Sequence, residues 1–161
     1  MKNEEYNLKK NGYYLESKFL GEKLILGYEK GCVLRISSPY EFLYFPENIL
    51  SKFYQQATKD RVIKIWGKGQ REQDFVNLED CLFWINSIAE EKITGVYNAT
   101  SGHAVTTYQL AKHIIGSSDI SLVFETLRDE QNQFTRYDNN KIIQVTNHYP
   151  KHIFDSIQCL Q

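Results

Sequence analysis

Apolar and polar positions along the chain follow two repeats, one typical of helices and one typical of strands. In residues 13–30 the apolar side chains, Tyr13, Leu20 and Leu24 among them, recur every three or four positions. This is the repeat of an amphipathic helix with one face on the core. The run Cys32–Ile36 is instead continuously apolar apart from one arginine, as buried strands are. By the same criteria we expect helices over residues 47–59, 79–93, 106–115, 138–145 and from Pro150 to about residue 160, and strands over 32–36, 62–66, 74–76, 95–99 and 120–124.

Small polar residues and glycines mark where these elements begin and end. Asn11, Thr106 or Thr107, and Asp138 are placed to cap helices, and Gly31 is placed to end the first one. Residues 37–46 break the pattern and predict an irregular loop, and residues 67–70 predict a turn between strands. Helices and strands alternate throughout, so the fold class is α/β.

Length and charge limit what the chain can be. It has 161 residues, of which 42% are apolar, and a formal net charge of −1. One domain with a real core is expected, and a basic nucleic-acid binder or a polybasic membrane-surface protein is not. The sequence has no signal-peptide pattern and no apolar run long enough to cross a membrane, so we expect a cytoplasmic protein.

Cysteine, tryptophan and histidine offer no separate chemistry. Three widely spaced cysteines do not predict a disulfide framework or a zinc site, and we expect small core residues in a reducing compartment. The two tryptophans, Trp66 and Trp84, are also expected in the core. His148 and His152 are four residues apart but separated by Pro150, which favours packing histidines over a metal pair. We therefore expect no metal site.

Tyr14 and Lys18 form a Tyr-x-x-x-Lys pair on the first predicted helix. Positions i and i+4 share a helix face, so the phenol and the ammonium can converge on one ligand. A nearby positive charge stabilises a phenolate, which suits a tyrosine that takes or returns a hydroxyl proton during hydride transfer. The spacing alone is weak evidence, because several such pairs occur where composition predicts about one.

The residues around this pair carry a resemblance. Residues 14–22 read Tyr-Leu-Glu-Ser-Lys-Phe-Leu-Gly-Glu. This string resembles the active-site helix of NAD-dependent nucleotide-sugar epimerases and dehydratases, the extended short-chain dehydrogenase/reductases, where Tyr-x-x-Ser-Lys precedes a Gly-Glu pair. The resemblance continues in order and covers about residues 3–157. Leu34–Glu41 is similar to the family's Arg-x-x-Asn-x-Tyr-Gly. Gly67–Gly69 is similar to its Gly-x-Gly, and Gln73–Val76 is similar to its Arg-Asp-Phe-Val. The remaining matches are Asp80, Gly95–Asn98, Asp138–Lys141 and Tyr149–Pro150.

The resemblance implies roles for five residues. Tyr14 would be the catalytic acid/base, and Lys18 would assist it and hold the nicotinamide ribose of NAD or NADP, so that both bind the cofactor. Ser38, Arg71 and Gln73 would face a nucleotide-sugar substrate.

Three positions depart from the family pattern. Ser38 stands where the family has asparagine, Glu41 where it has glycine, and Gln73 where it has an arginine that grips the diphosphate. Arg71 lies two residues before Gln73 and would share its face on a hairpin. Its guanidinium suits a bidentate phosphate contact.

The family's strand–Gly-x-x-Gly-x-x-Gly–helix unit, which holds the cofactor pyrophosphate, has no counterpart in the sequence. The resemblance therefore implies the C-terminal half of such an enzyme, a single partial domain. Residues 12–36 and 95–116 would contribute to a Rossmann-type sheet, and residues 37–94 and 117–161 would form a small α/β substrate-binding lobe. The expected partners are a nucleotide sugar and either the missing N-terminal half or further copies of the chain. The alternative is a non-catalytic remnant or binding domain derived from that family.

Overall fold

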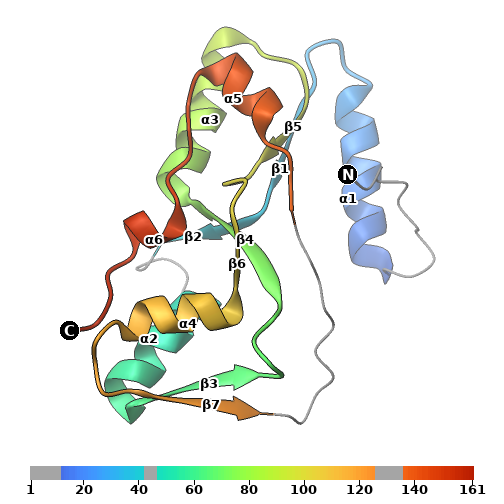
Figure 1. Ribbon diagram of the computed structural model, residues 1–161. Coiled ribbons are helices and arrows are strands. Elements are labelled where there is room, and N and C mark those ends of the chain that lie inside the picture. The colour runs from blue at the N-terminus through green and yellow to red at the C-terminus, as the bar shows by residue number, and fades with distance from the viewer. Residues whose placement is uncertain (1–11, 42–46, 126–135) are drawn as a thin grey trace.

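The computed structural model describes residues 12–41, 47–125 and 136–161. Helices and strands alternate through most of this part of the chain (Figure 1), which confirms the α/β class. The elements in order are α1 (Gly12–Leu26), β1 (Cys32–Ile36), β2 (Ser38–Tyr40), α2 (Ile49–Asp60), β3 (Val62–Trp66), β4 (Glu72–Asn77), α3 (Leu78–Glu91), β5 (Gly95–Ala99), β6 (Ala104–Thr106), α4 (Thr107–Ile115), β7 (Ser121–Glu125), α5 (Asn140–Thr146) and α6 (Ile153–Ser156).

The described strands form three small sheets. β1 pairs in parallel with β5, and β3 pairs in parallel with β7. Between these two pairs lies a three-stranded sheet in the order β2-β4-β6, with β2 parallel and β6 antiparallel to β4. Figure 1 shows this middle sheet between the β1–β5 pair above and the β3–β7 pair below.

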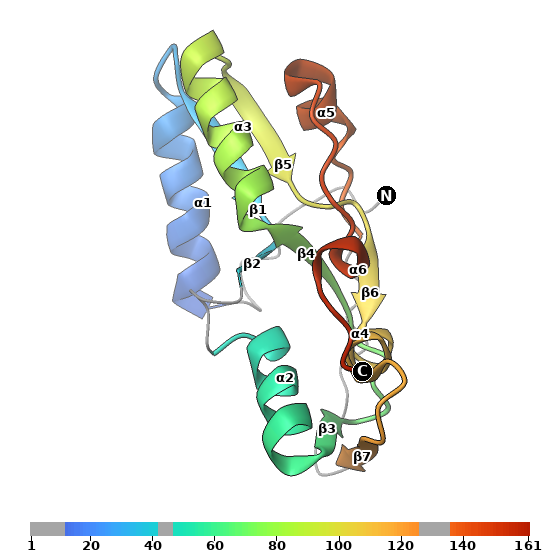
Figure 2. The same cartoon turned by 90° about the vertical axis from the view of Figure 1, so that its left-hand side faces the viewer.

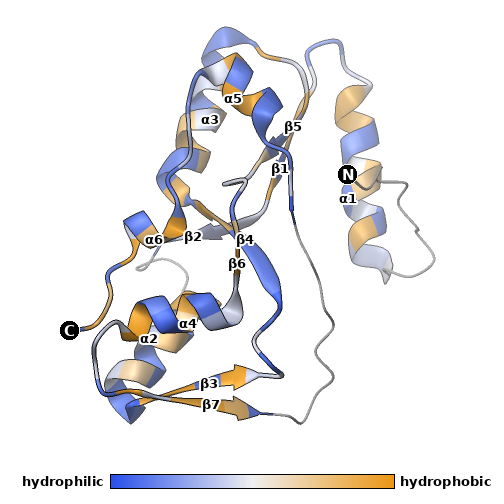
Figure 3. Ribbon diagram, viewed as in Figure 1, coloured by the Kyte–Doolittle hydropathy of each residue, from blue (hydrophilic) through white to orange (hydrophobic). Residues whose placement is uncertain are grey.

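Two hydrophobic clusters correspond to these upper and lower parts. The upper cluster comprises Val76, Cys81, Trp84, Ile88, Tyr97, Ala99 and Ile142, so α3 and α5 pack against β5. The lower cluster is larger and is built on α2, β3 and α4, with Ile63, Ile65 and Leu110 fully buried. Figure 3 shows apolar residues concentrated on β3 and β7, and Figure 2 shows α4 close to this pair of strands. Adjacent residues of β4, Phe75 and Val76, point into the lower and the upper cluster respectively.

Most local predictions are confirmed. The strands over 32–36, 62–66 and 95–99 have the predicted bounds. Thr106 caps α4 through a capping box in which its side chain accepts from the Gln109 amide and the Gln109 side chain accepts from the Thr106 amide. The predicted cap at Asp138 is wrong by one residue, because the N-cap of α5 is Asn139, although the Asp138 side chain accepts a hydrogen bond from the Asn140 amide. Asn11 lies outside the described residues.

The first helix forms, but the predicted stop at Gly31 is wrong, and the apolar stripe does not pack on a core. α1 ends at Leu26, and none of its residues is buried. Tyr13 and Leu24 are 91% and 71% exposed. The chain then turns back to β1 so tightly that a Cβ on Gly31 would collide with the Ile25 carbonyl, which explains the glycine.

Several other expectations are wrong. The segment 37–46 was expected to be irregular, but residues 38–40 form β2, and β6 has no apolar repeat to predict it. Trp66 is 54% exposed and Cys159 is exposed, so neither is a core residue. The Gly67–Gly69 turn joins β3 to β4, which lie in different sheets, so these strands do not form a hairpin.

The two clusters draw on helices from different parts of the sequence. α3 packs in the upper cluster with β5. α4 packs in the lower cluster.

The three cysteines are free, and their burial predicts different reactivities. Burial raises the pKa of the Cys81 thiol to about 11. The thiolate is the reactive species, so we expect a thiol reagent at neutral pH to modify Cys159 first, the half-buried Cys32 more slowly, and Cys81 only on unfolding. Mass spectrometry of the protein during modification measures this order. Modification of Cys81 as fast as Cys159 in the folded protein would contradict the packing of α3.

Candidate functional site

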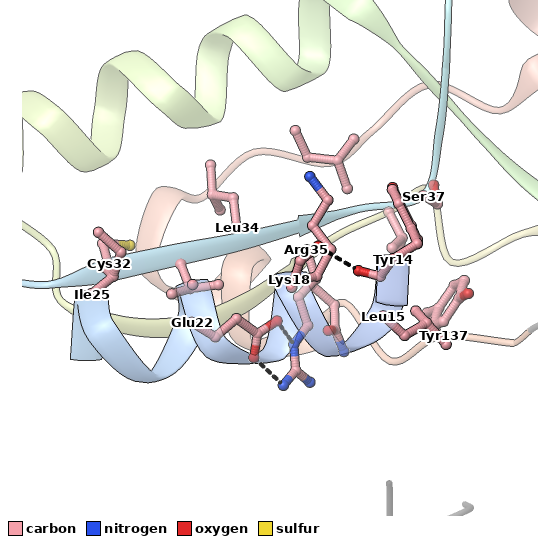
Figure 4. Close-up of a pocket in the computed structure, with 16 residues that line it drawn as sticks. Tyr14, Leu15, Lys18, Glu22, Ile25, Cys32, Leu34, Arg35, Ser37 and Tyr137 are labelled. Carbon is pink, nitrogen blue, oxygen red and sulfur yellow. Dashed lines mark hydrogen bonds and ion pairs between the residues drawn. The ribbon is translucent and has the colours of Figure 1, made fainter. Parts of the chain in front are cut away.

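A cavity of about 850 Å³ lies between α1 and β1. Its α1 wall includes Tyr14, Ser17 and Lys18, and its β1 wall is the strand itself with Ser37 beyond its end. Figure 4 shows α1 running beside β1, with Tyr14 near the carboxyl end of the strand and Ile25 near its start. Ligands of parallel sheets bind at the carboxyl ends of the strands, so Tyr14 lies at the edge where a ligand is expected.

Tyr14 and Lys18 converge as their spacing predicts. Lys18 Nζ lies 5.3 Å from the centroid of the Tyr14 ring, within the range of a cation–π contact. Tyr14 is 70% exposed, so its phenol is accessible to a ligand. Ser17 donates a hydrogen bond of 2.7 Å to the Tyr14 carbonyl on the same helix.

Glu22 of the Gly-Glu pair on α1 forms an ion pair with Arg35 on β1. Arg35 donates from Nε to Glu22 Oε1 at 2.9 Å and from its terminal nitrogen to Oε2 at 2.8 Å. Figure 4 shows the two contacts as dashed lines. The pairing is bidentate, the geometry in which arginine binds a carboxylate best. It holds α1 against β1 one turn away from Lys18.

The three expected substrate residues lie outside this cavity. Ser38 on β2 and Gln73 on β4 are brought together, because Gln73 Nε2 donates to Ser38 Oγ at 2.6 Å. Arg71 is exposed just before β4, and its carbonyl accepts a hydrogen bond from the Thr107 amide at the start of α4. The five predicted residues therefore form two groups, Tyr14 with Lys18 and Ser38 with Gln73, and Arg71 lies apart from both.

Asp74 is a buried residue that the sequence matched only as part of a motif. Its side chain is 1% exposed and accepts three hydrogen bonds. Ser37 Oγ donates to Oδ1 at 2.8 Å, the Ser101 amide to Oδ1 at 2.9 Å and the Gly102 amide to Oδ2 at 2.9 Å. One carboxylate thus joins β4 to the segments that follow β1 and β5.

A second buried carboxylate, Asp80, holds the C-terminal segment. Its Oδ1 lies 2.8 Å from His148 Nε2, and its Oδ2 accepts from the Lys151 amide at 3.0 Å. The His148 ring stacks on Phe83 at 4.1 Å. His152 accepts a hydrogen bond from the Phe154 amide at the start of α6. Both histidines therefore have packing and hydrogen-bonding roles, as expected.

The cavity brings a phenol and a cation together, those of Tyr14 and Lys18, and no phosphate-binding loop lines it in the described part of the chain. Gly67 and Gly69 both have positive φ, but they link strand to strand and do not open a helix that could bind a pyrophosphate. Among residues 12–41, 47–125 and 136–161, no group of three histidine, cysteine or acidic side chains could hold a metal ion. No helix in the same ranges is long and apolar enough to cross a membrane.

Comparison with known families agrees with this arrangement. The sequence matches the model of the NAD dependent epimerase/dehydratase family over residues 1–100, more than half of its length. The chain belongs to this family. A search of curated proteins finds no match.

Solved structures share the fold of this epimerase/dehydratase family member. The dTDP-glucose 4,6-dehydratase of Bacillus anthracis in complex with NAD has a TM-score of 0.74 and 21% identity over 90% of this chain and 49% of its own. The ADP-L-glycero-D-manno-heptose-6-epimerase of Helicobacter pylori has a TM-score of 0.74 and 18% identity over 91% and 48%. The UDP-N-acetylglucosamine 4-epimerase of Methanobrevibacter ruminantium, in complex with UDP-N-acetylmuramic acid, has a TM-score of 0.74 and 18% identity over 86% and 48%. The chain spans about half the length of these structures.

Because α1 has no buried side chain, we expect the Glu22–Arg35 pair to contribute much of its attachment. Arg35→Lys keeps the charge and loses the bidentate geometry, at a cost of about 1 kcal/mol for a partly exposed pair. Hydrogen exchange of the α1 amides should then rise about fivefold. Lys52→Gln removes the more exposed Lys52–Glu47 pair and is the control. Equal exchange in α1 of both variants would show that the pair does not hold the helix.

Proposed function

We propose that the chain is part of an NAD- or NADP-dependent enzyme that acts on a nucleotide sugar, with Tyr14 as acid/base and Lys18 as its cationic partner. The observation that carries the proposal is the convergence of these two side chains at the mouth of the α1–β1 cavity. Membership in the epimerase/dehydratase family supports it, as does the presence of NAD or a UDP-sugar in the named complexes of two structural neighbours.

The residues of this chain would handle the proton of the reaction. The Tyr14 phenolate would take the proton from a substrate hydroxyl as the carbon that bears it loses a hydride, which leaves a carbonyl. Lys18 would stabilise the phenolate while the proton is absent. A nicotinamide cofactor supplies the hydride acceptor. Return of a hydride to that carbon, together with the proton from Tyr14 to its oxygen, would complete an epimerisation or a reduction of the carbonyl.

We also propose that this chain carries the C-terminal part of such an enzyme, and that a glycine-rich nucleotide-binding unit completes it. The unit would lie upstream in the same gene or in a separate chain. The structure supports this in two ways. α1 has no buried residue, and the β1–β5 sheet has two strands in the described part of the chain, whereas parallel sheets are normally covered on both faces.

On this proposal the two hydrophobic clusters correspond to two functional parts of the enzyme. The upper part, which contains β1, β5, α3 and α5, would complete the nucleotide-binding sheet. The lower part, which contains α2, β3, α4 and β7, would form the substrate lobe.

A second candidate is a non-catalytic domain derived from the family. The observation that favours it is the Gln73–Ser38 hydrogen bond, because the two side chains contact each other without a ligand. Arg71, the residue that could replace the family's diphosphate-binding arginine, is not at the cavity.

The DNA immediately upstream of Met1 tests the first candidate directly. An in-frame coding region for a glycine-rich strand–helix unit would support it. Joined to such a unit and supplied with NAD or NADP, the chain should convert one member of a nucleotide-sugar panel to a new sugar product. Tyr14→Phe should then lower kcat by about 10²–10⁴-fold, because the acid/base is lost.

Tyr13→Phe is the matched control for this experiment. Tyr13 is adjacent on α1 and 91% exposed, so its hydroxyl should not matter. Equal activity of the Tyr14→Phe and wild-type proteins would rule out the assigned acid/base. Turnover by the isolated 161-residue chain would contradict the proposal that a second unit is needed to complete the enzyme.

The exposed side of α1 and the free edge of β1 also predict the behaviour of the isolated chain. Leu20, Leu24 and Ile25 are 55%, 71% and 44% exposed on one helix. Apolar surface of this kind associates in water. We expect light scattering to report oligomers or poor solubility, and a stable monomer at all accessible concentrations would be the opposite result.

A further inference from the structure

We propose that Asp74 is a positioning residue that fixes the upper part of the molecule relative to the lower part. It would thereby set where Ser38 and Gln73 lie relative to Tyr14 and Lys18. The positioning role follows from the hydrogen bonds of Asp74, and its consequence for catalysis rests on the proposed function.

The carboxylate lies where the chain passes between the two parts. β2, β4 and β6 form the sheet between the upper and lower elements (Figure 1). Ser37 lies between β1 and β2, Asp74 is on β4, and Ser101 and Gly102 lie between β5 and β6. The three hydrogen bonds of Asp74 therefore bind both of these connections to one point on β4.

The same point is linked to both groups of candidate site residues. Asp74 and Ser37 are hydrogen-bonded, and their sequence neighbours Gln73 and Ser38 are hydrogen-bonded to each other. Ser37 also lines the α1–β1 cavity and directly follows the strand that Arg35 ties to Glu22 on α1. Three side-chain contacts, joined by short stretches of backbone, thus connect α1 through β1 and Asp74 to the Ser38–Gln73 pair.

Only a carboxylate satisfies this site. All three partners are donors, and both oxygens of Asp74 accept. An asparagine would turn an N–H₂ group toward one of these donors, so at least one buried hydrogen bond would be lost. The Gly102 amide reaches Oδ2 with φ of 75°, a conformation that other residues adopt with strain.

Pulsed electron paramagnetic resonance on the full chain can test the proposal without any enzymatic activity. Nitroxide labels at Lys59→Cys on α2 and Glu90→Cys on α3 report the distance between the two parts, since both positions are exposed. Cys32→Ser and Cys159→Ser remove the two accessible thiols. Cys81 stays, because it is buried and its pKa is raised to about 11.

In this background Asp74→Asn should broaden the distance distribution and shift its mean. Ser37→Ala, which removes one of the three hydrogen bonds, should shift it less and in the same direction. Ile142→Val is the stability control, because Ile142 is buried within the upper cluster and is not a partner of Asp74. It should lower the thermal midpoint and leave the distance unchanged.

An unchanged distance in folded Asp74→Asn with a lowered midpoint would overturn the proposal and leave Asp74 a purely stabilising residue. If Asp74→Asn does not fold, Ser37→Ala decides in the same way. Absence of nucleotide-sugar turnover in the completed protein would overturn the proposed function and leave these distances unaffected.

Discussion

The arrangement of this chain depends on one buried carboxylate. An ionised carboxylate removed from water is strongly destabilising unless its oxygens accept hydrogen bonds, and Asp74 accepts three from two segments that are distant in sequence. Folding therefore has to bring Ser37, Ser101 and Gly102 to β4 together. The small residues at 101 and 102 follow from the same requirement, because two successive amides must face one side chain.

The helix that carries the candidate acid/base is held much less firmly. α1 has no buried side chain, and its described link to β1 is an ion pair whose partners are 32% and 17% exposed. Such a pair contributes little compared with a packed core. Proton transfer needs its groups held to within a fraction of an ångström, which rigid, well-packed elements provide. The chemistry assigned to Tyr14 and Lys18 therefore requires further packing around α1, which is why the proposed enzyme needs a second unit.

Local elements were predictable because their signals are local. The run Val62–Trp66 and the Thr106 cap each contain their own evidence in a few adjacent residues, and the structure reproduces both. The strands β2 and β6 have three residues each, too few for a repeat, and they exist because β4 pairs with them. The apolar stripe of α1 was read correctly as a helix and wrongly as buried, since burial depends on what packs against it.

The candidate site shows the same limit. The spacing of Tyr14 and Lys18 predicted their convergence, because both lie on one helix. The contact between Ser38 and Gln73 spans 35 positions and follows from the pairing of β2 with β4, which no local pattern indicates. The sequence identified Asp74 only as one position of a matching motif. Its role in joining β4 to two other segments follows from the three donors around it.

The two groups of site residues bear differently on the choice between an enzyme and a remnant. The Ser38–Gln73 hydrogen bond joins the two side chains without a ligand, yet a single neutral hydrogen bond contributes only about 1 kcal/mol, and a ligand that offers equivalent partners can replace it. It therefore weighs little against substrate binding. Tyr14, Lys18 and the Glu22–Arg35 pair form a more demanding set, because a domain that no longer catalyses gains little from a phenol and an ammonium at the mouth of a cavity on a helix with no buried residue. Their joint presence favours an active site that is complete only with its second unit, and the substrate then depends on residues that both units contribute.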